Sequence, residues 1–98
     1  MAQYSSLQAI ERASLSKNLS ASALVYTGIG FVQGVVINSN SSGTLKLWDS
    51  LTAANTVLFN TITFGATEHY IDLFGAKFST GLFATIGGTA DITIMYCV

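Results

Sequence analysis

Apolar and polar side chains alternate in short runs along most of the chain, beginning near residue 19. A period of two residues places every second side chain on the same face of an extended strand. These runs predict two strands with a bend between them before residue 40. The positions expected to share a face are Leu24 and Tyr26 before a glycine break at 28–30, and Phe31, Val35 and Ile37 after it.

The polar stretch NSNSSG, residues 38–43, separates GVVIN from TLKLWD. Asn, Ser and Gly favour the backbone conformations of tight turns, so this stretch predicts the loop of a β-hairpin. In the strand that follows, Leu45 and Leu47 lie on one face, and Lys46 and Trp48 lie on the other. We therefore expect one face in the core and the other at the surface or in an interface.

The second half of the chain contains four more runs, separated mainly by glycines. The last run alternates most clearly, with Ile92, Ile94, Tyr96 and Val98 on one face. About seven or eight short strands in one small domain are typical of a β-sandwich or jelly roll. We predict an all-β fold, a single-domain antiparallel β-sandwich of jelly-roll type over residues 19–98. The four runs are TVLFNTITF at 56–64, HYIDLF at 69–74, GLFATI at 81–86 and ADITIMYCV at 90–98.

The first 18 residues show no sustained period of either kind. Ser5 and Gln8 have the spacing of a helix capping box, but the segment is too short to form a stable helix alone. We predict that residues 1–18 form an N-terminal arm, either extended or as a short helix, ahead of the sandwich.

The composition points to a protein that associates with others. Only 9% of the 98 residues are charged, against about a quarter in an ordinary soluble domain, and a surface with few charges is poorly protected against association. The net charge of -1 leaves no basic stripe for phosphates, so we predict no nucleic-acid partner. The chain contains no proline, a residue that often blocks sheet edges, and its edges are expected to be covered by neighbouring molecules.

One uncharged stretch, residues 18–45, contains the spacing Gly30-xxx-Gly34 that is used by packed transmembrane helices. Its most apolar part, LSASALVYTGIGFVQGVVIN, is interrupted by Ser, Thr, Gln, Asn and Gly residues, which argues against a spanning helix. We therefore predict no membrane partner and keep a small membrane protein as the third alternative. The N-terminus lacks the features of a secretory signal, so synthesis in a cytoplasm is expected.

The residue types of a metal or acid–base site occur together once, at Glu68, His69 and Asp72. On a strand, side chains alternate between faces, so these three do not converge. No G-x-S-x-G elbow or phosphate loop is present. The single Cys97 is expected as a small buried side chain in the last strand. We predict no catalytic residue, no metal site and no cofactor, and we expect that the chain is not an enzyme.

Trp48 is the best candidate for contact with a partner, because it shares a strand face with Lys46 and lies beside a turn. One interpretation is a platform on which a sugar stacks. The other, which we prefer, is a place in the packed core or in a subunit interface.

Three segments together carry a family resemblance: GFVQGVVINSNSSGTLKLWDS at 30–50, NTVLFNTITF at 55–64 and GLFATIGGTADITIMYCV at 81–98. In them the chain resembles the small all-β virion proteins encoded among the structural genes of tailed bacteriophages. The resemblance covers roughly residues 24–98 and consists of strands and turns without a catalytic signature. It implies copies that decorate or cement the capsid exterior, or form part of a head fibre or tail component, commonly as trimers.

These observations favour a non-enzymatic virion structural protein that decorates or cements the capsid as a homo-oligomer, with a trimer implied by the resemblance. Its expected partners are the major capsid protein or other virion proteins, and its expected location is the virion, after synthesis in the host cytoplasm. The alternative is a receptor- or carbohydrate-binding module of a phage fibre or spike. The predicted contact residues are Tyr4, Leu7 and Ile10 in the arm and Trp48, Phe59 and Tyr70 on the sheets.

Overall fold

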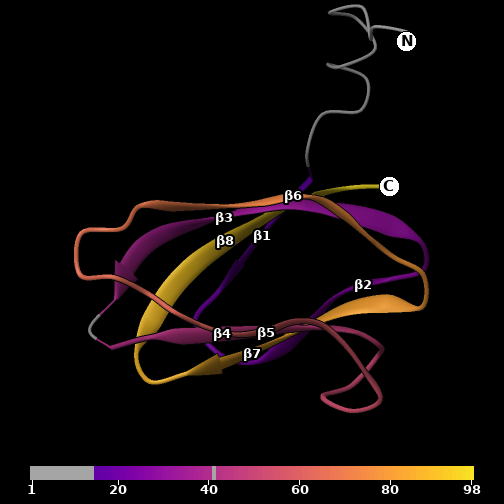
Figure 1. Ribbon diagram of the computed structural model, residues 1–98, viewed down its shortest axis with the longest axis horizontal. Helices are drawn as coiled ribbons and strands as arrows, with labels where there is room; N and C mark the ends of the chain where they lie inside the picture. The colour runs from indigo at the N-terminus through magenta and orange to yellow at the C-terminus, as the bar shows by residue number, and fades with distance from the viewer. Residues whose placement is uncertain (1–14, 41) are drawn as a thin grey trace, which may run out of the picture.

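Two four-stranded antiparallel sheets pack face to face around one core (Figure 1). The computed structural model describes residues 15–40 and 42–98. Sheet A has the strand order β1-β8-β3-β6, and sheet B has the order β2-β7-β4-β5. The predicted all-β antiparallel sandwich is confirmed. In chain order the strands are β1 (Leu15–Leu19), β2 (Ala23–Thr27), β3 (Gly30–Asn40), β4 (Thr44–Asp49), β5 (Thr56–Thr63), β6 (Tyr70–Phe78), β7 (Gly81–Gly87) and β8 (Ala90–Cys97).

The sandwich begins earlier than the predicted boundary at residue 19. Residues 15–18 were expected in the arm, but they belong to β1, in which Leu15 lies opposite Tyr96 of β8 and Leu19 lies opposite Ile92. β1 is at the edge of sheet A and only its last residue is buried, so its sequence shows little alternation. The rest of the predicted arm, residues 1–14, lies outside the described residues.

The predicted hairpin between β3 and β4 is wrong, although both strands are present. β3 lies in sheet A between β8 and β6, whereas β4 lies in sheet B between β7 and β5. The loop between them therefore crosses from one sheet to the other. An alternating pattern on both sides of a turn fits a hairpin and a crossing equally well, because in both cases the two apolar faces meet the same core.

The pairing of the strands follows one scheme that the alternating pattern did not reveal. β1 pairs with β8, β2 with β7, β3 with β6, and β4 with β5, always antiparallel. The chain is thus arranged like a two-stranded ribbon that doubles back at the β4–β5 loop and wraps across both sheets. Among the described strands, only β4 and β5 are both consecutive in the chain and neighbours in a sheet.

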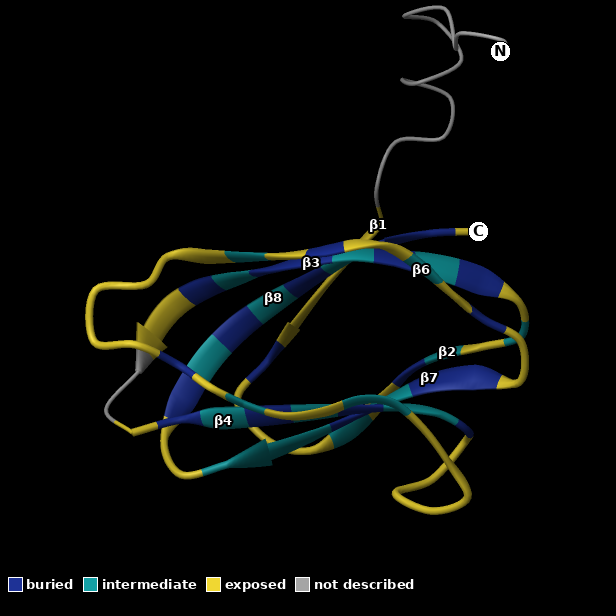
Figure 2. Cartoon of the chain, viewed as in Figure 1, coloured by how far each residue is buried: buried dark blue, intermediate teal, exposed yellow. Residues whose placement is uncertain are grey.

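The core lies between the two sheets (Figure 2). In β4, Leu45 and Leu47 are fully buried, while Lys46 and Trp48 are half-buried on the outer face, as the alternation predicted. Both sheets contribute large side chains, so neither sheet buries its apolar face without the other. The largest fully buried side chains are Phe78, Leu45, Leu47, Leu73, Leu82, Ile92, Ile94, Val32 and Val35.

A bulge changes which side chains of β3 face the core. The register of β3 shifts between Val32 and Gly34 against both of its neighbours. As a result Val32, rather than Phe31, joins Val35 and Ile37 in the core. A strict period of two residues cannot predict such a shift, because a bulge adds a residue to one strand only.

The structure also differs from the predicted pattern in β2 and at the end of β8. In β2 a bulge between Leu24 and Tyr26 places Val25 in the core. Leu24 and Tyr26 lie opposite Phe83 and Leu82, which are adjacent in β7. Leu24 and Tyr26 were predicted to share a face, but they lie on opposite faces. Val98 follows the end of β8 and is exposed, whereas Ile92, Ile94 and Tyr96, which were predicted on the same face, are buried.

All four edge strands carry a feature that discourages further strand pairing, which argues against edges covered by neighbours. Lys17 of β1 lies opposite the buried Ile94, on the core side of the sheet, and an inward-pointing charge is one such feature. The other edge strands, β2, β5 and β6, each contain a bulge, which twists an edge away from pairing.

Candidate functional site

Four apolar side chains form a row across the outer face of sheet B, which we call the apolar row. Leu24 lies opposite Phe83, Phe83 opposite Trp48, and Trp48 opposite Val57, and residues directly opposite one another share a face. Leu47 beside Trp48, and Leu82 and Ala84 on either side of Phe83, are fully buried, so the row points away from the core. Leu24 is 36% exposed and Val57 is 42% exposed, so both ends of the row are accessible to solvent.

The Trp48 side chain is fixed on this face by two neighbours. Its indole Nε1–H donates a hydrogen bond to Thr85 Oγ1 at 3.0 Å, and the Lys46 ammonium lies 4.5 Å from the centre of its ring. An ammonium over an aromatic face is an attractive cation–π contact. A sugar stacked on that face of the ring would have to displace Lys46.

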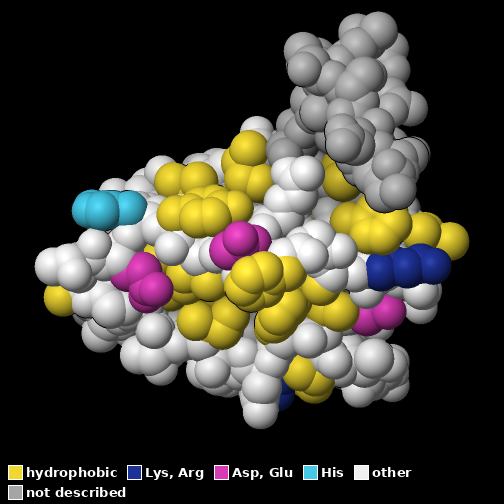
Figure 3. Space-filling model, turned by 45° about the horizontal axis from the view of Figure 1, so that its top comes forward, with side chains coloured by type: hydrophobic (Ala, Val, Ile, Leu, Met, Phe, Trp, Pro, Cys, Tyr) yellow, Lys and Arg dark blue, Asp and Glu magenta, His cyan; other side chains and the backbone are white. Residues whose placement is uncertain are grey.

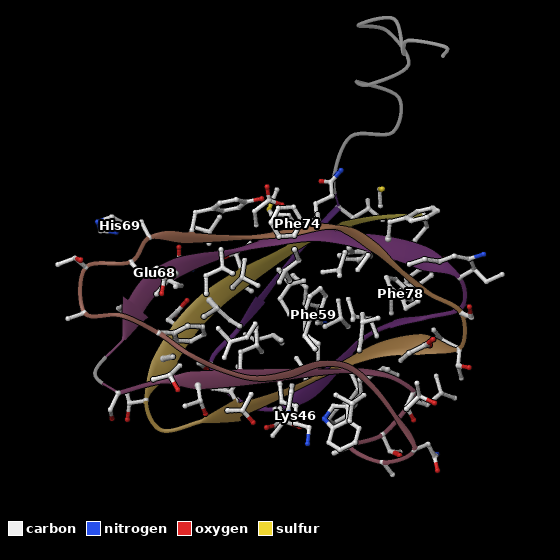
Figure 4. The ribbon with its side chains drawn as sticks, viewed as in Figure 1. Lys46, Phe59, Glu68, His69, Phe74 and Phe78 are labelled. Carbon is white, nitrogen blue, oxygen red and sulfur yellow. The ribbon has the colours of Figure 1, made fainter. Side chains whose placement is uncertain are left out.

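The structure separates the other predicted contact residues. Phe59 lies opposite Leu47 and packs against the core from between the sheets (Figure 4). Tyr70 is exposed at the start of β6, and its hydroxyl lies 3.5 Å from the carbonyl oxygen of Gln33. Phe59 and Tyr70 therefore do not join Trp48 in one surface. The three predicted arm residues lie outside the described residues.

Glu68, His69 and Asp72 do not converge on a common ligand. Glu68 Oε1 accepts a hydrogen bond from the backbone N–H of Gly65 at 3.0 Å, and Asp72 Oδ1 accepts one from the N–H of Phe74 at 2.7 Å. His69 is exposed and points away from the sandwich (Figure 4). Across residues 15–40 and 42–98, no group of three or more His, Cys, Asp or Glu side chains is placed to hold a metal ion.

Asp49, at the end of β4, holds the turn between β6 and β7. Its Oδ1 accepts hydrogen bonds from the backbone N–H groups of Ser79 at 3.0 Å, Thr80 at 2.8 Å and Gly81 at 3.4 Å. Desolvation raises the pKa of Asp49, but the three hydrogen bonds outweigh it and hold the pKa below the usual value. The carboxylate therefore has a structural role, joining sheet B to the turn that leads back from sheet A.

Asp91 has a similar role on the outer face of sheet A. Its Oδ1 accepts hydrogen bonds from the Nδ2 of Asn18 at 2.7 Å and of Asn38 at 3.0 Å, so it links β8 to both neighbouring strands. These bonds, with that from Asn18 the stronger, lower the pKa of Asp91. Every side-chain carboxylate of the described residues thus accepts a hydrogen bond from the protein itself.

The domain is expected to lose stability in acid as Asp49 and Asp91 become protonated. A carboxyl whose pKa is lowered by folding stabilises the protein above its unfolded pKa of about 3.9, and this contribution is lost as the pH falls through the folded pKa. The melting temperature should therefore decrease as the pH is lowered below about 4. Circular dichroism at a series of pH values measures this.

The variant Asp49→Asn keeps an acceptor oxygen but does not titrate in this range, so its melting temperature should fall less steeply in acid than that of the unmodified chain. Asp49→Ala removes the acceptor and should cost about 1–2 kcal/mol at neutral pH. If the melting temperature of Asp49→Asn decreases in acid as steeply as that of the unmodified chain, the structural role of the Asp49 carboxylate is contradicted.

The lone Cys97 is buried in β8, as predicted, and is a free thiol. Sequence reasoning missed a different residue, Phe74, which is 84% exposed on β6. The signal for it was the sequence Asp72-Leu-Phe-Gly75, because an Asp two residues before and a Gly directly after are turn residues within a strand run.

Comparisons of the chain with protein-family models, curated protein sequences and solved structures find no match. The uncharged stretch that contains Gly30-xxx-Gly34 forms strands instead of a helix. In the part of the chain that the structure describes, no helix is long and apolar enough to cross a membrane.

Proposed function

We propose that the chain is a non-enzymatic structural protein of a bacteriophage virion, which decorates or cements the capsid exterior as a homo-oligomer. The pairing of β1 with β8, β2 with β7, β3 with β6 and β4 with β5 supports a jelly roll, a fold found among viral capsid proteins. The resemblance of residues 24–98 to small phage virion proteins supports the location, and it implies a trimer.

The apolar row is the observation that carries the proposal. The strands of sheet B contain only two charged side chains, Lys46 and Asp49, and Asp49 is engaged by the turn at 79–81. The row crosses four strands, a width of about 15 Å. Such a face suits an apolar protein surface better than a charged or strongly polar ligand.

The mechanism of a cement protein needs no chemical step. Each apolar square ångström removed from water contributes about 25 cal/mol. A protein that binds the assembled shell, and not its separated subunits, stabilises the shell by mass action. The proposed action is therefore the burial of the apolar row against the shell.

Replacement of residues in the apolar row is expected to weaken binding to capsids of the parent phage that lack this protein. Val57→Lys places a charge in the exposed part of the row, and Trp48→Ala removes its centre. A central aromatic contact is typically worth 2 kcal/mol or more, so each variant should bind about thirtyfold more weakly or worse. Co-sedimentation with the capsids over a range of concentrations measures this.

Ile29→Lys is the matched control, because Ile29 is exposed in the turn between β2 and β3, outside the row. It should bind as the unmodified chain does. Unchanged shell binding by folded Val57→Lys and Trp48→Ala would contradict the proposal. A rise in melting temperature with host polysaccharide that Trp48→Ala abolishes would instead support the binding-module alternative.

A further inference from the structure

Phe74 is the most exposed large hydrophobic side chain of the described residues, at 84%. It lies on β6 and points to the outer side of sheet A, whereas Phe78 of the same strand points into the core (Figure 4). Seen from that side, the face shows several hydrophobic side chains with few charges between them (Figure 3). Phe74 is therefore exposed to solvent and does not pack against the core.

The backbone at Phe74 adopts a conformation that does not favour phenylalanine. Its φ is +61°, in the left-handed region that Gly and Asn adopt readily and aromatic residues avoid. Three residues of β6, 73–75, lie between the partners of Val32 and Gly34, where β3 has a single residue. The hydrogen bond from the Phe74 N–H to Asp72 Oδ1 holds this bulge in place.

A left-handed position that is open to water would be occupied at least cost by Asn or Gly. Phenylalanine is unfavourable there both for its backbone and for its exposed ring. Strained residues of this kind indicate functional positions, and a displayed aromatic ring suits the centre of a protein contact. The question is which surface covers it.

The charges beside Phe74 indicate a second copy of this chain. The surface carries one acidic and one basic side chain, so two copies of it are complementary. Asp72 and Lys77 are both exposed on β6, one on each side of Phe74. Asp72 lies opposite Gly34 and Lys77 lies opposite the half-buried Phe31, so both point to the outer side of sheet A. In a contact with two-fold symmetry, residue i of one copy meets residue j of the other, and j meets i.

A two-fold axis between Phe74 and Gly75 satisfies this requirement. With the two β6 strands crossing in opposite directions, Asp72 of each copy faces Lys77 of the second copy. The same axis brings each Phe74 ring towards Gly75 of the second copy. A Cβ added at Gly75 would have no atom within 4 Å, so this position offers room for a ring.

We propose that the outer side of β6 is a two-fold contact between copies of this chain, with Phe74 as its anchor and the Asp72–Lys77 pairs setting its register. The inference deepens the proposed function and rests on it, because that function requires copies to associate. A two-fold contact joins copies in pairs and is therefore separate from the contacts within the trimer that the resemblance implies. Its test uses the isolated chain and no capsid, whereas the test of the proposed function uses the face of sheet B. Failure of one is therefore distinguishable from failure of the other.

The test is the self-association of the purified chain by sedimentation velocity over a range of concentrations. Phe74→Asn removes the ring and relieves the backbone, so the variant should fold with an equal or higher melting temperature. Its self-association should be at least tenfold weaker than that of the unmodified chain. The proposal is overturned if the unmodified chain stays monomeric at millimolar concentration, or if Phe74→Asn associates within twofold of it.

A charge reversal tests the register. Lys77→Glu places two carboxylates opposite each other at both ends of the contact and should weaken association. Asp72→Asn added to Lys77→Glu removes that repulsion and keeps an acceptor oxygen for the Phe74 N–H, so part of the association should return. Leu51→Lys is the matched control, because Leu51 is exposed in the loop between β4 and β5, outside both β6 and the apolar row, and this variant should associate normally. No effect of Lys77→Glu, or an equal loss in Leu51→Lys, overturns the contact.

Discussion

Phe78→Ala is expected to lower the free energy of unfolding by about 3–5 kcal/mol, the usual effect of truncating a buried phenylalanine. Phe78 is fully buried, and its ring packs edge-on against Tyr26 with 6.3 Å between the ring centres. It also fills the space beside Gly30, where an added Cβ would come 2.6 Å from Phe78 Cζ. Small domains are stable by about 5–15 kcal/mol in total, so the variant should be close to unfolding.

Phe74→Ala provides a matched control on the same strand. The same truncation at an exposed site should change the free energy of unfolding by no more than about 0.5 kcal/mol. Urea denaturation followed by circular dichroism compares the two variants, at a protein concentration low enough to avoid self-association. Similar losses in both variants would contradict the placement of the core on one side of β6.

The alternating pattern was sufficient to predict the strands after β1 and the core side of several of them. Leu45 and Leu47 were expected in the core and are fully buried, because a regular strand leaves each side chain only two directions. Phe31 was expected to share a face with Val35 and Ile37, but the bulge in β3 places Val32 on that face instead. A bulge depends on the register with neighbouring strands, which local alternation does not contain.

The pairing of β3 was beyond prediction for a related reason. A hairpin and a crossing between sheets differ in where the next strand finds its partner, and that partner is distant in the sequence. β3 pairs with β6 and β8 rather than with the adjacent β4. Local turn chemistry therefore identified a loop correctly and still gave the wrong neighbour.

The candidate surface was predictable only in part. Trp48 and Lys46 were expected on one outer face, and they are. Leu24 and Val57 join Trp48 through the registers of three strand pairs, so no local pattern groups them. Phe74 was missed because an exposed aromatic residue on a strand with alternating side chains resembles a core residue until the bulge is known.

Removal of β1 is expected to destabilise the sandwich. β8 lies between β1 and β3, and its fully buried Ile92 and Ile94 lie opposite Leu19 and Lys17 of β1. A variant that lacks residues 2–19 therefore loses the pairing along β8 and the buried Leu19. We expect its free energy of unfolding to be lower by roughly 3 kcal/mol or more, because apolar area is exposed and hydrogen bonds are lost.

A variant that lacks only residues 2–14 should keep β1 and the whole sandwich, with a melting temperature close to that of the unmodified chain. If the predicted arm residues Tyr4, Leu7 and Ile10 contact the shell, this variant should fold normally and no longer bind capsids. A triple replacement of these residues by Ala keeps the length of the segment and should lose binding as well. Full capsid binding by both variants would restrict the contact with the shell to the faces of the sheets, where the apolar row lies.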